Sequence, residues 1–222
     1  MFRNNVLIIF VIAPLLTYCS KQPTGPFQDR FDDHLDGSTV KSMGKRLSAY
    51  KDTSAEAGRK PAYDIADGGL IAQNAYNHPL WLKRRLPENG TISVEVTALE
   101  EGGDLKVEAW GDGKSFALNK GAYTASGYVF IFGGWHNTIS AIARMNEHGS
   151  DRKIRQDQPV KAGKTYHFLI QRKNGHIRWL VDGKPFLELN DPRPLRGGKH
   201  AYFAFNNWET KTRFDNLVIT PE

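Results

Sequence analysis

The chain has 222 residues, a formal net charge of +6 at pH 7 and a single cysteine. This length suffices for one sandwich-sized domain with a substantial core, and a lone cysteine excludes an intrachain disulfide. The excess of Lys and Arg favours an anionic partner, although basic clusters on a folded domain are more commonly solvated surface.

The first residues have the pattern of an export signal. Residues 1–5 carry one positive charge, at Arg3, and residues 6–16 are apolar apart from the break at Pro14. Such a segment matches the n-region and h-region of a signal peptide and is too short to span a bilayer comfortably. We therefore expect residues 1–18 to be removed and the protein to work in the cell envelope. Export argues against nucleic acid as the partner.

The only cysteine, Cys19, follows the apolar segment directly. The motif Leu16-Thr17-Tyr18-Cys19 resembles the lipobox of bacterial lipoproteins, although Tyr18 replaces the small residue usual before the cysteine. The resemblance implies lipidation of Cys19, with residues 19–27 as a tether holding the domain at a membrane surface. The alternative is ordinary cleavage nearby, which leaves Cys19 idle or removed.

The sequence pattern of residues 28–222 indicates one β-rich domain. The segment 91–98 alternates cleanly and predicts a half-buried strand, and the segment 105–110 alternates as well. In the second strand Glu108 and Trp110 fall on one face, opposite Val107. A carboxylate beside a tryptophan on an outward face is a candidate site, and an exposed strand carboxylate without function is the alternative.

The uninterrupted apolar run 128–132 predicts a central strand buried on both faces. Gly133-Gly134 then breaks the strand and permits close approach of another group. Polar and aromatic residues cluster after this break and after the next predicted strand, 139–144. The residues of this cluster are Trp135, His136, Asn137, Arg144, Glu147 and His148. Arg144 would meet Glu108 if their strands were neighbours.

The remaining segments predict a meander. Asn174-Gly175 and Asp182-Gly183 are hairpin turns between the strands 166–172, 177–181 and 185–187. Alternating strands at 201–208 and 212–219 end the chain, and no sustained amphipathic helix occurs. Many short strands at turn-punctuated spacing predict an all-β, antiparallel β-sandwich or jelly roll.

Two C-terminal motifs carry a family resemblance. The segments 175–183 (GHIRWLVDG) and 214–219 (FDNLVI) resemble the concanavalin A-like lectin/glucanase superfamily, including its laminin G-like and 3-keto-disaccharide hydrolase-type domains. The resemblance implies a concanavalin A-like sandwich whose last strand pairs near the first. It does not decide function, because this fold hosts lectins, glycanases, lyases and adhesion modules.

The glucanase branch carries the pattern Glu-x-Asp-x-x-Glu, which this chain lacks. If the protein is an enzyme, a glycan-cleaving hydrolase or lyase, the candidate acid/base residues are Glu108, Glu147 and His148. The spacing of His136, Glu147 and His148 matches no established metal motif. We expect no metal and no cofactor, with calcium in a turn as the alternative.

Carbohydrate binding is the preferred hypothesis, because sugars stack on aromatic rings and their hydroxyls pair with amides, carboxylates and guanidinium groups. A structural envelope protein that binds a protein partner is a third hypothesis. Trp81 and Trp179, flanked by apolar residues, are expected in the core. The expected ligand-binding residues are Trp110, Trp135, His136, Asn137, Arg144, Glu147, His148, Asn207 and Trp208.

Overall fold

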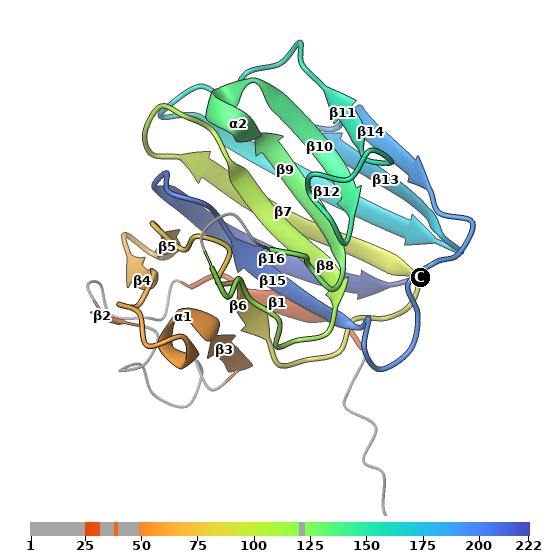
Figure 1. The fold of residues 1–222 in the computed structure, drawn as a ribbon, viewed down its shortest axis with the longest axis horizontal. Coiled ribbons are helices and arrows are strands. Elements are labelled where there is room, and N and C mark those ends of the chain that lie inside the picture. Colours follow the sequence, from red (N-terminus) through yellow and green to blue (C-terminus); the bar gives the residue numbers. More distant parts are fainter. Residues whose placement is uncertain (1–24, 32–37, 40–48, 120–122) are drawn as a thin grey trace, which may run out of the picture.

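The computed structural model describes residues 25–31, 38–39, 49–119 and 123–222. Two antiparallel sheets pack face to face as a β-sandwich (Figure 1). The predicted signal peptide and Cys19 lie outside the described residues. Within the described part of the chain, no helix is long and apolar enough to cross a membrane.

The first sheet contains the predicted meander and the last strand. Its order is β14-β13-β12-β7-β16-β5-β4-β2, with β1 paired to β16. Both hairpins and the pairing of the last strand near the first are confirmed. The strands are β1 (Phe27–Asp29), β2 (Ser38–Thr39), β4 (Tyr63–Ala66), β5 (Gly69–Ala72), β7 (Gly90–Ala98), β12 (Thr165–Lys173), β13 (His176–Val181), β14 (Lys184–Asn190) and β16 (Thr212–Pro221).

The second sheet contains the predicted central strand. Its order is β11-β10-β9-β8-β15-β6-β3, so β9 is indeed internal and its residues are buried throughout. Two four-residue helical turns, α1 (Thr53–Glu56) and α2 (Gly134–Asn137), lie beside its strands. The strands are β3 (Tyr50–Asp52), β6 (Leu80–Leu82), β8 (Leu105–Gly111), β9 (Tyr128–Gly133), β10 (Ile139–Arg144), β11 (Lys153–Arg155) and β15 (Tyr202–Asn206).

The main core fills the space between the sheets. Alternate residues of β7, among them Ile92, Val94 and Val96, and Trp179 of β13 in the same sheet pack in this core with Phe130 and Phe132 of β9 from the second sheet. Aromatic edge-to-face pairs such as Phe132 with Tyr166, at 4.8 Å between ring centroids, add to the burial. Trp179 is therefore a core residue, as predicted. Trp81 is also buried, and its indole Nε1 donates to the Ser115 carbonyl at 3.0 Å.

The expectation that Trp110 shares the outer face with Glu108 is wrong. Trp110 has a positive φ of 53°, and the pairing of β8 with β15 shifts register between Tyr202 and Ala204. This irregularity breaks the strict alternation of a strand and turns the indole into the main core. There its Nε1 donates to the Pro87 carbonyl at 2.9 Å.

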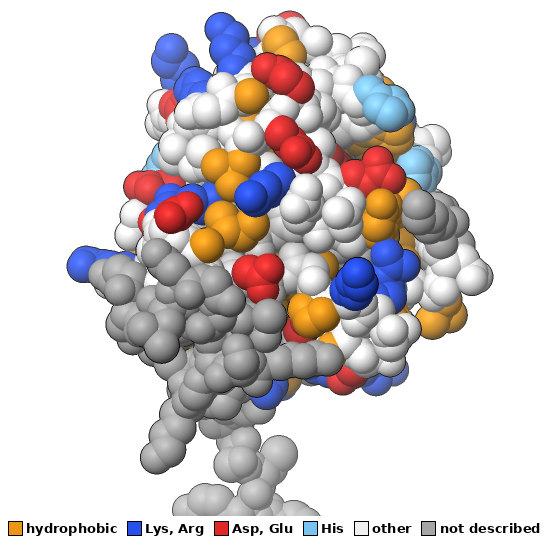
Figure 2. Space-filling model, turned by 90° about the vertical axis from the view of Figure 1, so that its left-hand side faces the viewer, with side chains coloured by type: hydrophobic (Ala, Val, Ile, Leu, Met, Phe, Trp, Pro, Cys, Tyr) orange, Lys and Arg blue, Asp and Glu red, His pale blue; other side chains and the backbone are white. Residues whose placement is uncertain are grey.

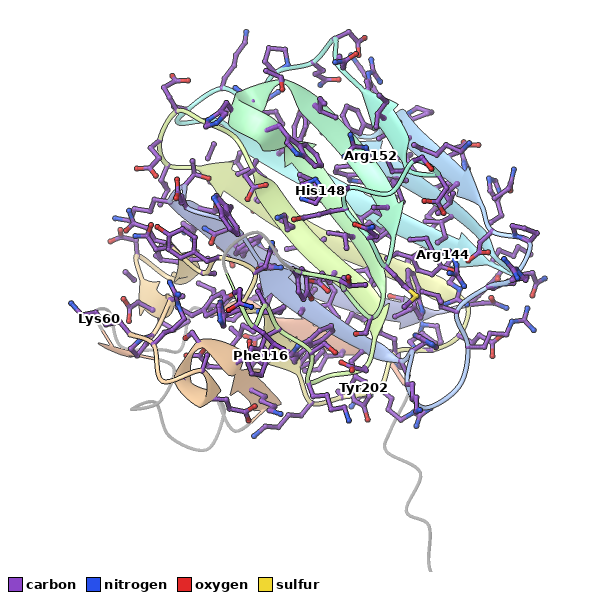
Figure 3. All side chains as sticks on the ribbon, in the orientation of Figure 1. Lys60, Phe116, Arg144, His148, Arg152 and Tyr202 are labelled. Carbon is purple, nitrogen blue, oxygen red and sulfur yellow. The ribbon has the colours of Figure 1, made fainter. Side chains whose placement is uncertain are left out.

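The condition for a contact between Arg144 and Glu108, that their strands be neighbours, is not met, because β9 lies between β10 and β8. Arg144 instead donates through Nε to Asp191 Oδ2 at 2.8 Å. Figure 3 shows Arg144 farther along the sandwich than His148 and Arg152.

A candidate carbohydrate-binding cleft

The outer face of the second sheet carries a small apolar patch and a larger polar network. Residues of the loop 112–127, including Ala117, Tyr123 and Ala125, pack on Val129 and Ile131 of β9. Next to this covered patch a cleft of about 320 Å³ remains open. We call it the tryptophan cleft; it is lined by Gly102, Asp104, Lys106, Ile131, Trp135, His136, Glu147, His148, Trp208, Glu209 and Thr210.

Lys106 forms the floor of the tryptophan cleft. Its side chain is only 3% exposed, and its Nζ donates to Asn77 Oδ1 and Glu147 Oε2, both at 3.0 Å. Asp104 Oδ1 lies 3.5 Å from the same Nζ. Burial lowers the pKa of Lys106, but Asp104 and Glu147 more than offset this and keep the pKa above its usual value. The lysine is therefore a fixed cation held between two carboxylates.

The two carboxylates beside Lys106 have different acidities. Burial raises the pKa of Asp104 despite the nearby ammonium. Burial also acts on Glu147, but the charge and hydrogen bond of Lys106, together with a 3.1 Å bond from Asn77 Nδ2, bring its pKa below the usual value. The cleft floor thus holds a weaker acid and a stronger acid around one cation.

Glu108 lies beneath this floor and is completely buried. Tyr123 Oη donates to both of its carboxylate oxygens at 2.8 Å, and Asn206 Nδ2 donates to Oε1 at 2.7 Å. Burial raises the pKa of Glu108 to about 7, against the opposing effect of these hydrogen bonds. Glu108 is therefore not the exposed strand carboxylate that we considered. Because it does not line the cleft, it has no direct access to a ligand.

One wall of the cleft is formed by α2 and the loop after β10. Trp135 packs edge to face against His148 at 5.6 Å, and Arg152 lies 4.6 Å above the Trp135 ring. Figure 3 shows His148 and Arg152 near each other over the strands β9 and β10. Arg152 also donates to the Glu147 carbonyl at 2.7 Å, which ties the loop to this wall.

The backbone of this wall is strained. Trp135, His136 and Asn137 have φ values of 51°, 56° and 62°, in the left-handed region that residues with side chains rarely occupy. Gly133 precedes them with φ 70°, and a Cβ there would lie 2.6 Å from Val160 Cγ2. The close approach expected at Gly133-Gly134 is confirmed. Strain of this kind concentrates at functional sites, and here it points Trp135 into the cleft.

The opposite wall is formed by Trp208, which a hydrogen bond from its backbone N–H holds in place. Its N–H donates to Asp104 Oδ2 at 2.6 Å, and its ring packs edge to face on Tyr76 at 5.1 Å. The half-buried indoles of Trp135 and Trp208 therefore flank a polar floor. This arrangement can stack a sugar ring and pair with its hydroxyls.

The structure brings together five of the predicted ligand-binding residues: Trp135, His136, Glu147, His148 and Trp208. The other four lie elsewhere. Trp110 is in the core, and Arg144 pairs with Asp191. Asn137 exchanges two 2.8 Å hydrogen bonds with the backbone of Val160, and Asn207 bonds the backbone of Ala75 and Ala72. These two amides hold loops in place and do not line the cleft.

Sequence reasoning missed Asp104, Lys106 and Asn77. Asp104 has a φ of 59°, which is typical of a turn residue, but its carboxylate also lines the cleft. The available signal was Lys106 two positions before Glu108, which puts a cation and a carboxylate on one face of a strand. Asn77 lies in an irregular segment and has no sequence signal.

The described residues contain no group of three or more His, Cys, Asp or Glu side chains arranged to hold a metal ion. His148 Nε2 lies 3.7 Å from Glu147 Oε1, an ion pair only when the imidazole is protonated.

Residues 100–217, more than half of the chain, match the model of the family described as Farnesoic acid 0-methyl transferase. The chain belongs to this family. The matched span begins before Gly102 and ends in β16, so it includes every residue that lines the tryptophan cleft. Among curated protein sequences, none matches the chain.

Solved structures place this member of the family among concanavalin A-like sandwiches. A lichenase from a mouse hindgut metagenome is 12% identical, with a TM-score of 0.56 over 89% of this chain and 100% of its own. The carbohydrate-binding module CBM66 of Bacillus subtilis is 9% identical, with a TM-score of 0.53 over 82% and 96%. An alginate lyase bound to alginate trisaccharide is 12% identical, with a TM-score of 0.50 over 89% and 98%. At these identities the likeness shows the fold, as the sequence motifs predicted.

Proposed function

We propose that the protein is an exported, lipid-anchored envelope protein that binds carbohydrate in the tryptophan cleft. The observation that carries this proposal is the pair of half-exposed indoles, Trp135 and Trp208, on either side of a charged, hydrogen-bonded floor. The fold neighbours add support, since they include a carbohydrate-binding module and glycan-cleaving enzymes.

The name of the family suggests a farnesyl ligand instead, and the cleft does have apolar walls, which include Ile131, Trp135 and Trp208. Its floor does not suit an isoprenoid tail, because it consists of the charged side chains of Asp104, Lys106 and Glu147. Covering these groups with hydrocarbon would remove their remaining contact with water. A polyhydroxyl ligand replaces that water with hydrogen bonds of its own.

The binding proposal is tested by a glycan array on the mature protein, followed by titration of each hit. Trp135→Ala removes the stacking platform, and we expect its affinity to fall about 30-fold, which corresponds to about 2 kcal/mol. Arg144→Ala is the matched control, because Arg144 lies outside the cleft, and its affinity should equal that of the unsubstituted protein. Full binding by Trp135→Ala, or failure of every glycan to bind, would reject the proposal and turn attention to a protein partner.

Glycan cleavage is the second candidate, favoured by the two carboxylates at Lys106. A general acid needs a raised pKa, as Asp104 has, and a base or nucleophile needs a lowered pKa, as Glu147 has. Under this hypothesis Asp104→Asn retains glycan binding and loses turnover, measured by mass spectrometry of the bound ligand. Intact ligand after prolonged incubation with the unsubstituted protein would leave binding as the function.

Membrane anchoring is tested separately at Cys19. If the lipobox resemblance is correct, Cys19→Ser removes the acylated thiol and moves the protein from the membrane fraction to the soluble fraction. Immunoblotting of the two fractions measures this shift, and Ser20→Ala serves as a neighbouring control. An unchanged distribution would refute the lipid anchor without affecting the glycan proposal.

A further inference from the structure

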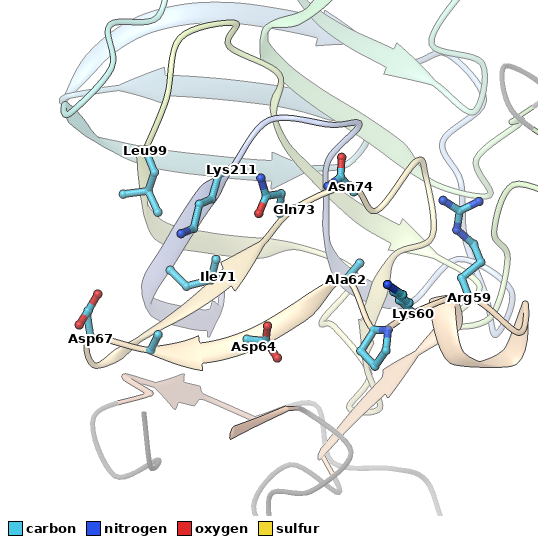
Figure 4. A pocket seen from close by; sticks show the side chains of 12 residues that line it. Arg59, Lys60, Ala62, Asp64, Asp67, Ile71, Gln73, Asn74, Leu99 and Lys211 are labelled. Atoms are coloured by element: carbon cyan, nitrogen blue, oxygen red, sulfur yellow. The ribbon is translucent and has the colours of Figure 1, made fainter. Parts of the chain in front are cut away.

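A second cleft, of about 670 Å³, lies on the other side of the segment that carries Trp208. We call it the cationic cleft; Arg59, Lys60, Gln73, Asn74 and Lys211 are among its lining residues. Its floor is formed by β4 and β5, and Figure 4 shows Lys211 and Gln73 above these strands. Figure 2 shows this end of the molecule, where Lys and Arg side chains lie among apolar side chains and carboxylates.

The cations of this cleft outnumber its carboxylates and form no ion pair with the described residues. None of the ion pairs formed within the described part of the chain involves Arg59, Lys60 or Lys211. Two carboxylates, Asp64 and Asp67, also line the cleft, and Asp67 lies at the opposite end from Arg59 (Figure 4). Three cations against two carboxylates leave the cleft with a positive net charge. In the tryptophan cleft, by contrast, Lys106 is paired with Asp104 and Glu147.

The wall between the clefts is thin and aromatic. The N–H groups of Asn74 and Tyr76 donate to the carbonyls of Glu209 and Trp208, at 3.1 and 2.9 Å. The Arg59 guanidinium lies 4.9 Å from the Tyr76 ring, which also packs edge to face on the ring of Trp208. A ligand that extends from Trp208 across Tyr76 therefore arrives at Arg59.

The two clefts differ in the charge that they accept. The tryptophan cleft contains Asp104, Glu147 and Glu209, so an anionic sugar unit there would meet like charges. The cationic cleft offers unpaired guanidinium and ammonium groups, which pair with carboxylate or sulfate. An uncharged glycan would leave these cations without a partner.

We propose that the natural ligand is an acidic heteroglycan in which a neutral sugar unit, bound in the tryptophan cleft, is joined to a carboxylate- or sulfate-bearing unit, bound in the cationic cleft. This inference rests on the proposed function and names its substrate class. It also predicts the orientation of the ligand, from Trp135 through Trp208 and Tyr76 to Arg59.

Calorimetry on the mature protein tests the inference with hyaluronan hexasaccharide, which alternates neutral and carboxylate-bearing units, and with its carboxyl-reduced counterpart. A κ-carrageenan hexasaccharide and its desulfated form provide the sulfate arm. We expect at least one charged probe to bind about tenfold more tightly than its neutral counterpart at low salt, with the preference shrinking at high salt. The arm that shows the larger preference identifies the anionic group.

The triple variant Arg59→Gln/Lys60→Gln/Lys211→Gln should lose this preference and keep its affinity for the neutral probes. The control Lys161→Gln/Lys173→Gln/Lys184→Gln changes net charge equally at exposed positions outside both clefts and should keep the preference. Equal affinity for charged and neutral probes, or a preference that survives in the triple variant, would overturn the inference while leaving glycan binding intact. If no probe or arrayed glycan binds at all, both the inference and the proposed function fail.

Discussion

Replacing Lys106 by Met is expected to lower the free energy of unfolding by about 3–5 kcal/mol at pH 8. The substitution keeps the length of the side chain and removes the buried ammonium group that lies between Asp104 and Glu147. Both carboxylates then remain largely buried without a counterion, and Asn77 Oδ1 loses a hydrogen bond donor. Urea denaturation followed by tryptophan fluorescence measures the loss.

Two further variants show whether the loss comes from the uncompensated charges. Lys106→Met/Glu147→Gln removes one of these charges and should recover part of the lost stability. Lys173→Met breaks an exposed ion pair with Glu222 and should change stability by less than about 1 kcal/mol. A Lys106→Met protein as stable as its parent would show that the floor of the cleft is open to water and is not a preorganised network.

As the pH rises from 5 to 8, the free energy of unfolding of Glu108→Gln is expected to increase by about 3 kcal/mol relative to that of the unsubstituted protein. The folded-state pKa of Glu108 is about 7, above the ordinary value of 4.5 that applies to the unfolded chain. Between these values the folded state holds a proton that the unfolded state has lost. The carboxyl group therefore stabilises the fold below about pH 4.5, and this contribution disappears as the pH rises through 7.

Glutamine does not titrate, so the difference between the two proteins isolates Glu108 from the other ionisable groups. Equilibrium denaturation at several pH values gives this difference directly, and Glu101→Gln, at an exposed position, should show a constant difference. A pH-independent difference for Glu108→Gln would mean that its carboxylate is hydrated in the native protein.

The strands were predictable because their signals are local. Alternation in β7, the apolar run of β9 and the Asn-Gly and Asp-Gly turns of the meander each reflect burial or turn geometry within a few residues. The same reasoning failed at Trp110, where one positive φ turns a side chain from the outer face to the core. A β-bulge has no reliable signature in a single sequence.

Composition and period alone determined the all-β class, the antiparallel meander and the cluster after Gly133. Only the tertiary structure decided which polar residues share a site, because the order of strands in a sheet does not follow the order of the sequence. It brings Lys106, Glu147 and Trp208 into one cleft, hydrogen-bonds Asn77 to the first two, and separates Arg144 from Glu108 by the width of β9. The tertiary structure also decided which outward-facing side chains are buried. Glu108 has the position of an exposed residue in the alternating pattern of its strand, and it is covered only because the loop that carries Tyr123 folds over it.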